Sequence, residues 1–161
     1  MQGLPTHFLA GSGELTGLMR NHDWSASPLG PPDAWPQSLK TLVRFALETR
    51  FPMFLAWGEA LTFLYNDAYS EILGKRHPAA LGRPFQEIWS DIWEEVLPFI
   101  KRALEGESVY LENLPLTMYR KGYAEPTWFT FTYYPLRDDA GVIRGMSYVC
   151  METTRHVLAE L

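Results

Sequence analysis

Residues 61–74 read Leu-Thr-Phe-Leu-Tyr-Asn-Asp-Ala-Tyr-Ser-Glu-Ile-Leu-Gly. The first five of them form a short apolar run that is typical of a strand. Asn66 or Asp67 is placed to cap a short helix that continues through Leu73. Gly74 then follows, a residue type that commonly ends helices. This stretch therefore predicts a strand that passes directly into a short helix.

Apolar runs and turn residues extend this pattern on both sides. Met53–Trp57 is a second apolar run, and Gly58-Glu59-Ala60 separates it from the run at 61–65, which predicts a β-hairpin. Both faces of Met53–Trp57 are apolar, which indicates a central strand covered on both sides. The C-terminal half adds one helix and three strands, predicted at Ile92–Glu105, Ser108–Tyr119, Thr127–Leu136 and Val142–Glu152.

The order of these elements predicts the fold class. Each strand pair is joined by a tight turn or by a compact helical insert, so we expect a five-stranded antiparallel sheet in an α+β fold. At the start of the long helix at 92–105, Asp91 and Glu94 resemble a capping box. Its apolar face would cover one face of the sheet.

The first 50 residues predict a helical extension. Residues 1–11 show no periodicity and are expected to be a loose end, followed by a helix over Ser12–Asn21 with Ser12 as its cap. A second helix is expected to start at Asp33. Its apolar stripe should pack on the outer face of the sheet, against Val149 or Met151. The stripe consists of Leu39, Leu42, Val43 and Leu47.

Composition excludes several classes of protein. The chain has 161 residues and a net charge of −5, which argues against nucleic acid and an anionic membrane as partners. Its single cysteine, Cys150, excludes an intrachain disulfide and indicates a reducing compartment. There is no apolar stretch long enough for a membrane span and no secretory signal. We therefore expect a soluble, cytoplasmic protein.

The order of elements along the chain (two strands, helices, then three strands) and the local motifs together resemble the PAS family. Within residues 61–74, the strand, the Asn, the Ala-aromatic pair and the Leu-Gly are similar to the family pattern. Leu81-Gly82-Arg83-Pro84-Phe85 and Ile88-Trp89 resemble the segment that follows, and Met151-Glu152-Thr153-Thr154 resembles the acidic-x-Thr exit into a signalling helix. Asp23-Trp24-Ser25 and residues 35–39 resemble an extension that precedes PAS domains of bacterial sensor histidine kinases.

This resemblance implies the domain organisation and the function. Residues 1–50 would be the extension, 51–154 the PAS core and 155–161 the start of the signalling helix. The chain would be a sensory module that binds a small ligand or a partner. It would form a homodimer and relay its signal through the C-terminal helix to an effector, a histidine kinase of a two-component system. No enzyme activity and no catalytic residues are expected in the chain itself.

Two other functions stay open at this point. The first is a structural dimerisation module whose cavity is filled by its own aromatic side chains. The second is a small cone-shaped α+β enzyme, although that class usually opens with a long helix and carries buried Asp-His pairs, and neither is evident.

His156 lies on the predicted C-terminal helix without the flanking residues of a phosphoacceptor histidine, so a solvated helix position is expected.

The candidate ligand-pocket residues are Tyr69, Trp93, Tyr148 and Cys150. The period of two places Tyr148 and Cys150 on one face of the last strand. No cofactor is expected, and an unidentified small molecule is the expected class of ligand. The resemblance argues against flavin, because there is no Asn-Cys-Arg motif and Cys150 stands where flavin-binding relatives carry glutamine.

Haem and metal ions are not expected either. The helix at 92–105 contains no histidine to ligate haem, and His77 is the only candidate ligand within the fold. No cluster of His, Cys, Asp or Glu has the spacing of a metal site.

Overall fold

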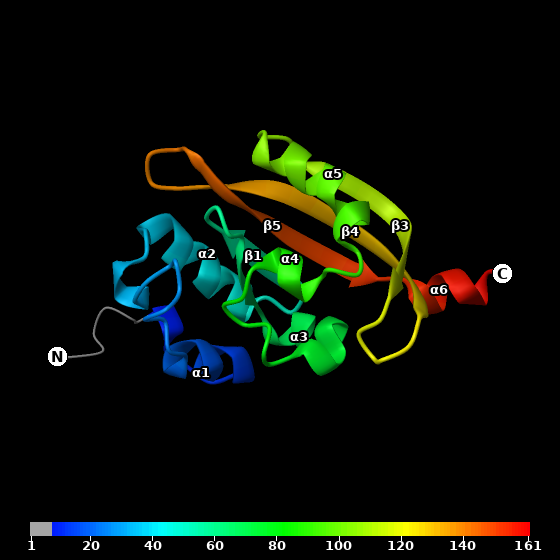
Figure 1. Ribbon diagram of the computed structural model, residues 1–161, viewed down its shortest axis with the longest axis horizontal. Coiled ribbons are helices and arrows are strands. Elements are labelled where there is room, and N and C mark those ends of the chain that lie inside the picture. The colour runs from blue at the N-terminus through cyan, green and yellow to red at the C-terminus, as the bar shows by residue number, and fades with distance from the viewer. Residues whose placement is uncertain (1–7) are drawn as a thin grey trace.

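The computed structural model describes residues 8–161, so the first seven residues of the expected extension lie outside it (Figure 1). The predicted strands are all present, and their bounds differ from the expected ones by at most two residues. The helices are α1 (Glu14–Asn21), α2 (Gln37–Glu48), α3 (Asp67–Leu73), α4 (Phe85–Ile88), α5 (Trp93–Leu104) and α6 (Thr154–Ala159). The strands are β1 (Met53–Trp57), β2 (Thr62–Tyr65), β3 (Val109–Met118), β4 (Glu125–Arg137) and β5 (Ile143–Glu152).

The five strands form one antiparallel sheet in the order β2-β1-β5-β4-β3. All five residues of β1 are buried, which confirms the expectation of a strand covered on both faces. The α+β class and the five-stranded antiparallel sheet are both confirmed.

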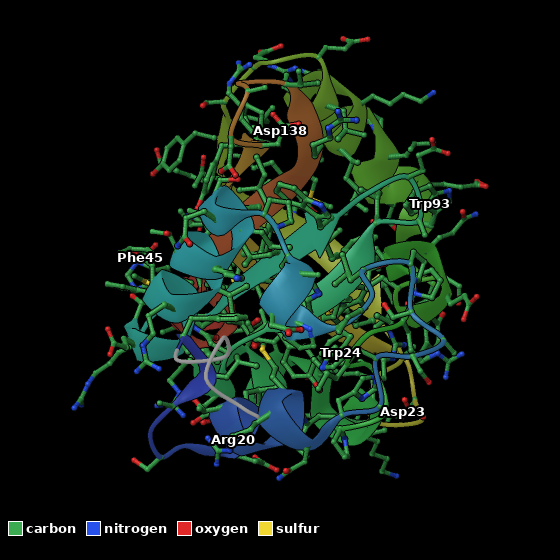
Figure 2. All side chains as sticks on the ribbon, turned by 90° about the vertical axis from the view of Figure 1, so that its left-hand side faces the viewer. Arg20, Asp23, Trp24, Phe45, Trp93 and Asp138 are labelled. Carbon is green, nitrogen blue, oxygen red and sulfur yellow. The ribbon has the colours of Figure 1, made fainter. Side chains whose placement is uncertain are left out.

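Helices flank the sheet on both sides. Figure 2 shows Phe45 of α2 and Trp93 of α5 on opposite sides of it. Residues of α3, α4 and α5 pack on the face that carries Phe54 of β1, whereas α2 lies against β1 and β2 on the other face. Val149 is half-buried, but Met151 is 54% exposed, so the expected packing against Met151 is wrong. The reason is that α2 covers the β1–β2 half of the sheet.

The edge strand β3 is irregular. Its register against β4 shifts between Leu111 and Leu114, and Asn113 has a φ of 51°. Pro115 follows within the same strand. A bulge of this kind leaves residues outside the regular ladder of backbone hydrogen bonds and bends the strand.

The predicted caps of the two N-terminal helices are wrong. Gly13 rather than Ser12 occupies the cap of α1, without a side-chain hydrogen bond to the helix. The carboxylate of Asp67, at the start of α3, accepts a hydrogen bond of 2.7 Å from the backbone N–H of Leu15 instead. Asp33 lies in a short 3-10 turn that precedes α2.

The true cap of α2 comes from the turn between β4 and β5. The two carboxylate oxygens of Asp139 accept hydrogen bonds from the backbone N–H groups of Gln37 and Ser38, at 3.2 and 2.8 Å. Both helices therefore take their caps from distant parts of the chain, which sequence proximity could not indicate.

The expected capping box before α5 is also wrong. Ile92 occupies the cap without a side-chain hydrogen bond. Asp91 instead accepts two hydrogen bonds of 2.9 Å from the guanidinium of Arg76 and one of 3.0 Å from the backbone N–H of Tyr119. Asp91 therefore joins the segment after α3 to the end of β3.

Residues 8–11 are held in place, although a loose end was expected. Leu9 is fully buried. The guanidinium of Arg20 donates to the carbonyl of Leu9 at 2.7 Å, and that of Arg44 donates to the carbonyl of Ala10 at 2.6 Å. Side chains from α1 and α2 thus fix this segment through its backbone, where no apolar periodicity is required.

Candidate functional site

Aromatic side chains fill the space between the sheet and helices α3 to α5. Phe54 stacks on Tyr148 with ring centroids 4.8 Å apart, and Tyr133 lies at 4.8 Å from the same ring. Tyr69 of α3 meets Phe54 edge-on at 5.3 Å. Phe54, Tyr133 and Tyr148 alternate with residues of the opposite face along their strands, so the pleat of the sheet directs them toward the helices.

A cavity of only about 10 Å³ remains in this interior. That volume is at the lower limit for a single water molecule. The interior is therefore closed by its own side chains. The lining residues are Phe54, Tyr69, Ile72, Phe85, Trp89, Ile92, Val96, Leu116, Met118, Phe129, Phe131, Tyr133 and Tyr148.

The structure brings together only part of the predicted pocket. Tyr69 and Tyr148 both line the cavity, with ring centroids 6.2 Å apart. Trp93, at the start of α5, is half-buried and packs on Phe85 with ring centroids 6.0 Å apart, outside the lining. Cys150 is buried on the same face of β5 as Tyr148 but lies beyond the lining.

The polar groups of this interior are uncharged. Burial raises the pKa of the Tyr69 and Tyr148 hydroxyls well above their ordinary value. Burial also raises the pKa of the Cys150 thiol to about 12. Since the thiolate is the reactive form of cysteine, Cys150 has the character of a structural rather than a catalytic residue.

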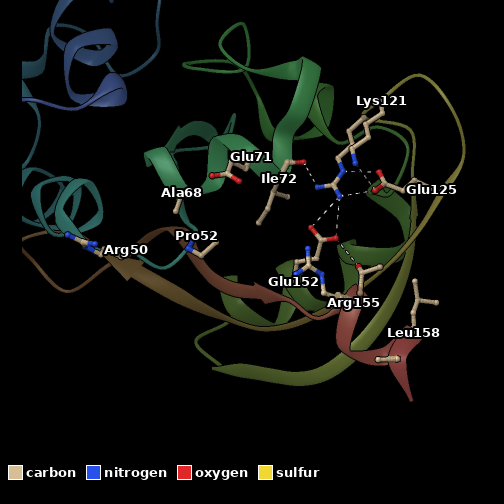
Figure 3. A pocket seen from close by; sticks show the side chains of 13 residues that line it. Arg50, Pro52, Ala68, Glu71, Ile72, Lys121, Glu125, Glu152, Arg155 and Leu158 are labelled. Atoms are coloured by element: carbon tan, nitrogen blue, oxygen red, sulfur yellow. Dashed lines mark hydrogen bonds and ion pairs between the residues drawn. The ribbon is translucent and has the colours of Figure 1, made fainter. Parts of the chain in front are cut away.

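A buried arginine marks a second site that the sequence reasoning missed. Arg120 lies in the turn between β3 and β4, and only 4% of the residue is exposed. Its guanidinium donates to the carbonyl of Ile72 at 2.7 Å, to the carboxylate of Glu125 at 3.0 Å and to that of Glu152 at 3.3 Å. We call Arg120 and its three partners, Ile72, Glu125 and Glu152, the Arg120 cluster; Figure 3 shows the three partners converging. The cluster joins α3, β4 and the end of β5.

The Arg120 cluster is hydrogen-bonded directly to α6, which we call the exit helix. Glu152 also accepts a hydrogen bond of 2.8 Å from the hydroxyl of Thr154, the first residue of α6. The same hydroxyl oxygen accepts a hydrogen bond of 3.0 Å from the backbone N–H of Trp128. The acidic-x-Thr segment singled out in the sequence is therefore the point where the cluster meets α6.

An open groove of about 1130 Å³ runs between α3 and α6 beside this cluster (Figure 3). Acidic and basic side chains both line it, together with the partly exposed Leu158. The lining residues are Arg50, Pro52, Ala68, Glu71, Ile72, Arg120, Lys121, Glu125, Glu152, Thr154, Arg155, Leu158 and Ala159.

Asn66 makes more contacts than the cap that the sequence predicted. Its side-chain oxygen accepts hydrogen bonds from the backbone N–H groups of Tyr69 at 3.0 Å and Met53 at 3.2 Å, which confirms the cap. Its amide nitrogen donates to the carbonyls of Ala46 at 3.0 Å and Phe51 at 2.9 Å. One buried side chain therefore joins α3, β1 and the end of α2.

Two of the histidines, His77 and His156, lie beside polar side chains in this fold. Nδ1 of His77 lies 2.8 Å from the hydroxyl of Tyr65, and Nε2 lies 2.9 Å from the carboxylate of Glu14. His156 is exposed on α6, 3.6 Å from Glu160. Over residues 8–161, no three His, Cys, Asp or Glu side chains are grouped so that they could hold a metal ion. Within the same range, no helix has the length and apolar character needed to cross a membrane.

Comparison with known families identifies the fold. Residues 52–157 match the family model described as the PAS fold. The chain belongs to the PAS family. No curated protein matches this PAS chain significantly.

Solved structures share the PAS architecture at low identity. The PAS domain of Bordetella pertussis BvgS is 20% identical with a TM-score of 0.57, over 76% of this chain and 92% of that one. A phage VqmA–DPO complex is 15% identical with a TM-score of 0.56, over 76% and 56%. An RNA-binding light-oxygen-voltage receptor is 18% identical with a TM-score of 0.56, over 74% and 34%. This chain therefore spans about a third to just over half of the last two proteins.

Proposed function

We propose that this PAS domain is a cytoplasmic sensory input module that relays a signal through α6 to an effector. The Arg120 cluster is the observation that supports it. Its buried guanidinium contacts Ile72 of α3, a residue that lines the interior, and also contacts Glu152, which hydrogen-bonds to α6. A shift of α3 would change these bonds and hence the start of α6.

In our proposal the effector is a histidine kinase of a two-component system. The resemblance of Asp23-Trp24-Ser25 to the extension of sensor kinases supports this choice, and the net charge of −5 supports leaving nucleic acid out. Other outputs occur among PAS-like proteins, since similar structures include a VqmA–ligand–DNA complex and an RNA-binding light-oxygen-voltage receptor.

The proposed signal is a small uncharged ligand or a partner surface, with no cofactor. VqmA, a structural neighbour, is described as bound to DPO. Here the phenols of Tyr69 and Tyr148 would offer hydrogen bonds to an uncharged group. Because the cavity measures only about 10 Å³, entry of a ligand would have to move side chains or α3 itself.

A second candidate function is an interaction module that binds no ligand. The filled interior is the specific observation in its favour, because the aromatic side chains already pack against one another.

For either function we propose a homodimer. Its interface would include the outer face of β3 to β5, which exposes Tyr110 and Met151, and the apolar side of α6.

Native mass spectrometry of the purified protein separates the two candidates. A retained compound that raises the melting temperature, and that shifts the backbone NMR signals of Glu152 and Thr154 on titration, is the result expected of a ligand sensor. An empty protein that binds no member of a metabolite library would favour the ligand-free module. In that case, substitution of Arg120 by Lys should still alter the signals of α6 if the cluster relays a partner's signal.

A further inference from the structure

The N-terminal end of α3 is hydrogen-bonded to both helices of the N-terminal extension. Asn66 caps α3 and donates hydrogen bonds to the carbonyl of Ala46, within α2, and to that of Phe51, just beyond that helix. The next residue, Asp67, accepts hydrogen bonds from the first backbone N–H groups of α1, those of Glu14 at 3.3 Å and Leu15 at 2.7 Å. Two adjacent residues thus hold the end of one helix and the start of another.

The last turn of α3 is connected to the exit helix α6 through hydrogen bonds. The carbonyl of Ile72 accepts the hydrogen bond of 2.7 Å from Arg120, which in turn holds Glu152. Between the two ends, Tyr69 is buried and lines the interior cavity. A helix of seven residues is only about 10 Å long, so the two fastened ends lie on one short element.

We propose that α3 couples α1 to the exit helix α6, so that loosening one changes the other. The path consists of Asp67 at α1, the body of α3, the carbonyl of Ile72, Arg120, and Glu152 at α6. Every link is a direct hydrogen bond or a rigid helix, which is a physical basis for coupling over a distance. Coupling of this kind acts equally in both directions.

This coupling makes the extension a second place where a signal can enter or leave. That α6 carries the output rests on the function proposed above. The coupling itself is a property of this chain and is measured without an effector or ligand, so its failure would leave the proposed function untouched.

Amide hydrogen exchange followed by NMR tests the coupling, with Asp67→Ala as the perturbation. Asp67 is exposed, so its loss removes the cap of α1 without opening the interior. The reporters are the backbone amides of Trp128 and Thr153, which form hydrogen bonds to Thr154 and Trp128 beside α6. We expect exchange at both reporters to increase about threefold or more, together with exchange in α1.

The matched control is Asp139→Ala, which also removes a carboxylate that caps an N-terminal helix but does not involve α3. It should loosen the first turn of α2 and leave Trp128 and Thr153 at the wild-type rate relative to the amides of β1. In the reverse direction, Glu152→Gln should increase exchange at Leu15. Equal effects of both Ala variants at the reporters, or loosened α1 with unchanged reporters, would overturn the proposal. Asp67→Asn, which keeps an acceptor oxygen, should give an intermediate increase.

Discussion

The carboxylate of Asp139, in the turn between β4 and β5, accepts a hydrogen bond of 2.8 Å from the backbone N–H of Ser38, which lies 101 residues earlier in the chain. This bond fastens the start of α2 to one end of the sheet, and Asn66 fastens its other end. In the apolar stripe between the two ends, Leu39 and Val43 are fully buried, and Leu42 and Leu47 are half-buried. The N-terminal helices are therefore part of the folded unit.

Deletion of residues 1–50 should lower the melting temperature by about 10 °C or make the protein aggregate. Burial of a single leucine or valine contributes roughly 1.5–3 kcal/mol, and the deletion exposes the sheet face under Leu39 and Val43. Circular dichroism melting and light scattering measure the two effects. Leu39→Ala should reproduce part of the loss, whereas Phe45→Ala, at a side chain that is 59% exposed, should change little. An unchanged melting temperature after the deletion would contradict this account.

Asn66→Ala should lower the free energy of unfolding by about 2–4 kcal/mol. The substitution removes a helix cap and leaves the buried N–H of Met53 and the carbonyl of Ala46 without their partner. Urea unfolding at neutral pH measures the change. Glu71→Ala, on the exposed side of the same helix, is the control and should stay within about 0.5 kcal/mol of wild type. A similar loss in both variants would show that the contacts of Asn66 are not the cause.

Gly145→Ala should destabilise the protein by about 3 kcal/mol or more, because a methyl group at this position would overlap the carbonyl of Ala56 and lie 2.9 Å from the Cα of Trp57. Both neighbours are backbone atoms of the paired strand β1 and cannot rotate away. Gly141→Ala is the comparison, since its φ of 84° is unfavourable for alanine but the space around it is open. That variant should cost about 1 kcal/mol. Urea unfolding of both variants tests the ranking, which equal losses would refute.

Glu125→Gln should reduce the acid sensitivity of the protein. Hydrogen bonding from Arg120 lowers the pKa of Glu125 from its ordinary 4.5, so the ionised carboxylate stabilises the fold above that value. The stabilisation is lost as pH falls through the lowered pKa of the folded state. The variant should be less stable than wild type at pH 7, and the difference should shrink below pH 4.5.

Urea unfolding from neutral pH down to about pH 3 follows this difference. Glu59→Gln removes the same charge from an exposed turn and should leave the pH dependence close to that of wild type. A stability gap between Glu125→Gln and wild type that stays constant over the whole range would contradict a linked carboxylate.

The purified protein should be colourless. The interior is filled by aromatic side chains, and both ring nitrogens of His77 are engaged by Tyr65 and Glu14. An absorbance spectrum of freshly purified protein checks this expectation. A flavin or haem band at near-stoichiometric intensity would show that the absence of an Asn-Cys-Arg motif and of a helix histidine was misleading.

Local signals in the sequence were sufficient to predict most of the fold. The cap at Asn66 and the apolar runs of β1 and β2 act over a few residues, and they were identified correctly. The caps at Asp67 and Asp139 could not be identified, because each acts on a helix more than fifty residues away. Asp91 shows the opposite error. The local pattern of a capping box is present, but the carboxylate of Asp91 accepts hydrogen bonds from the guanidinium of Arg76 and does not cap the helix.

The candidate site was predicted less completely. The period of two placed Tyr148 inward, and Tyr69 follows the cap by three residues, so both could be named. The degree to which neighbouring rings fill the space depends on packing between elements, which periodicity does not report. Arg120 was missed because it stands in an ordinary polar turn. The one related signal in the sequence is Glu152 before α6, the acidic residue that Arg120 pairs with in the fold.

The irregular edge strand restricts how copies of this domain can associate or aggregate. Pro115 offers no backbone N–H, and the displaced residues around Asn113 interrupt the row of donors and acceptors that another strand would need. Continuous addition of strands, the first step toward fibrils, is therefore blocked on this side of the sheet. Assembly along β3 must proceed through side chains, whose pattern can be specific to one partner, and not through the backbone, which is the same in every protein.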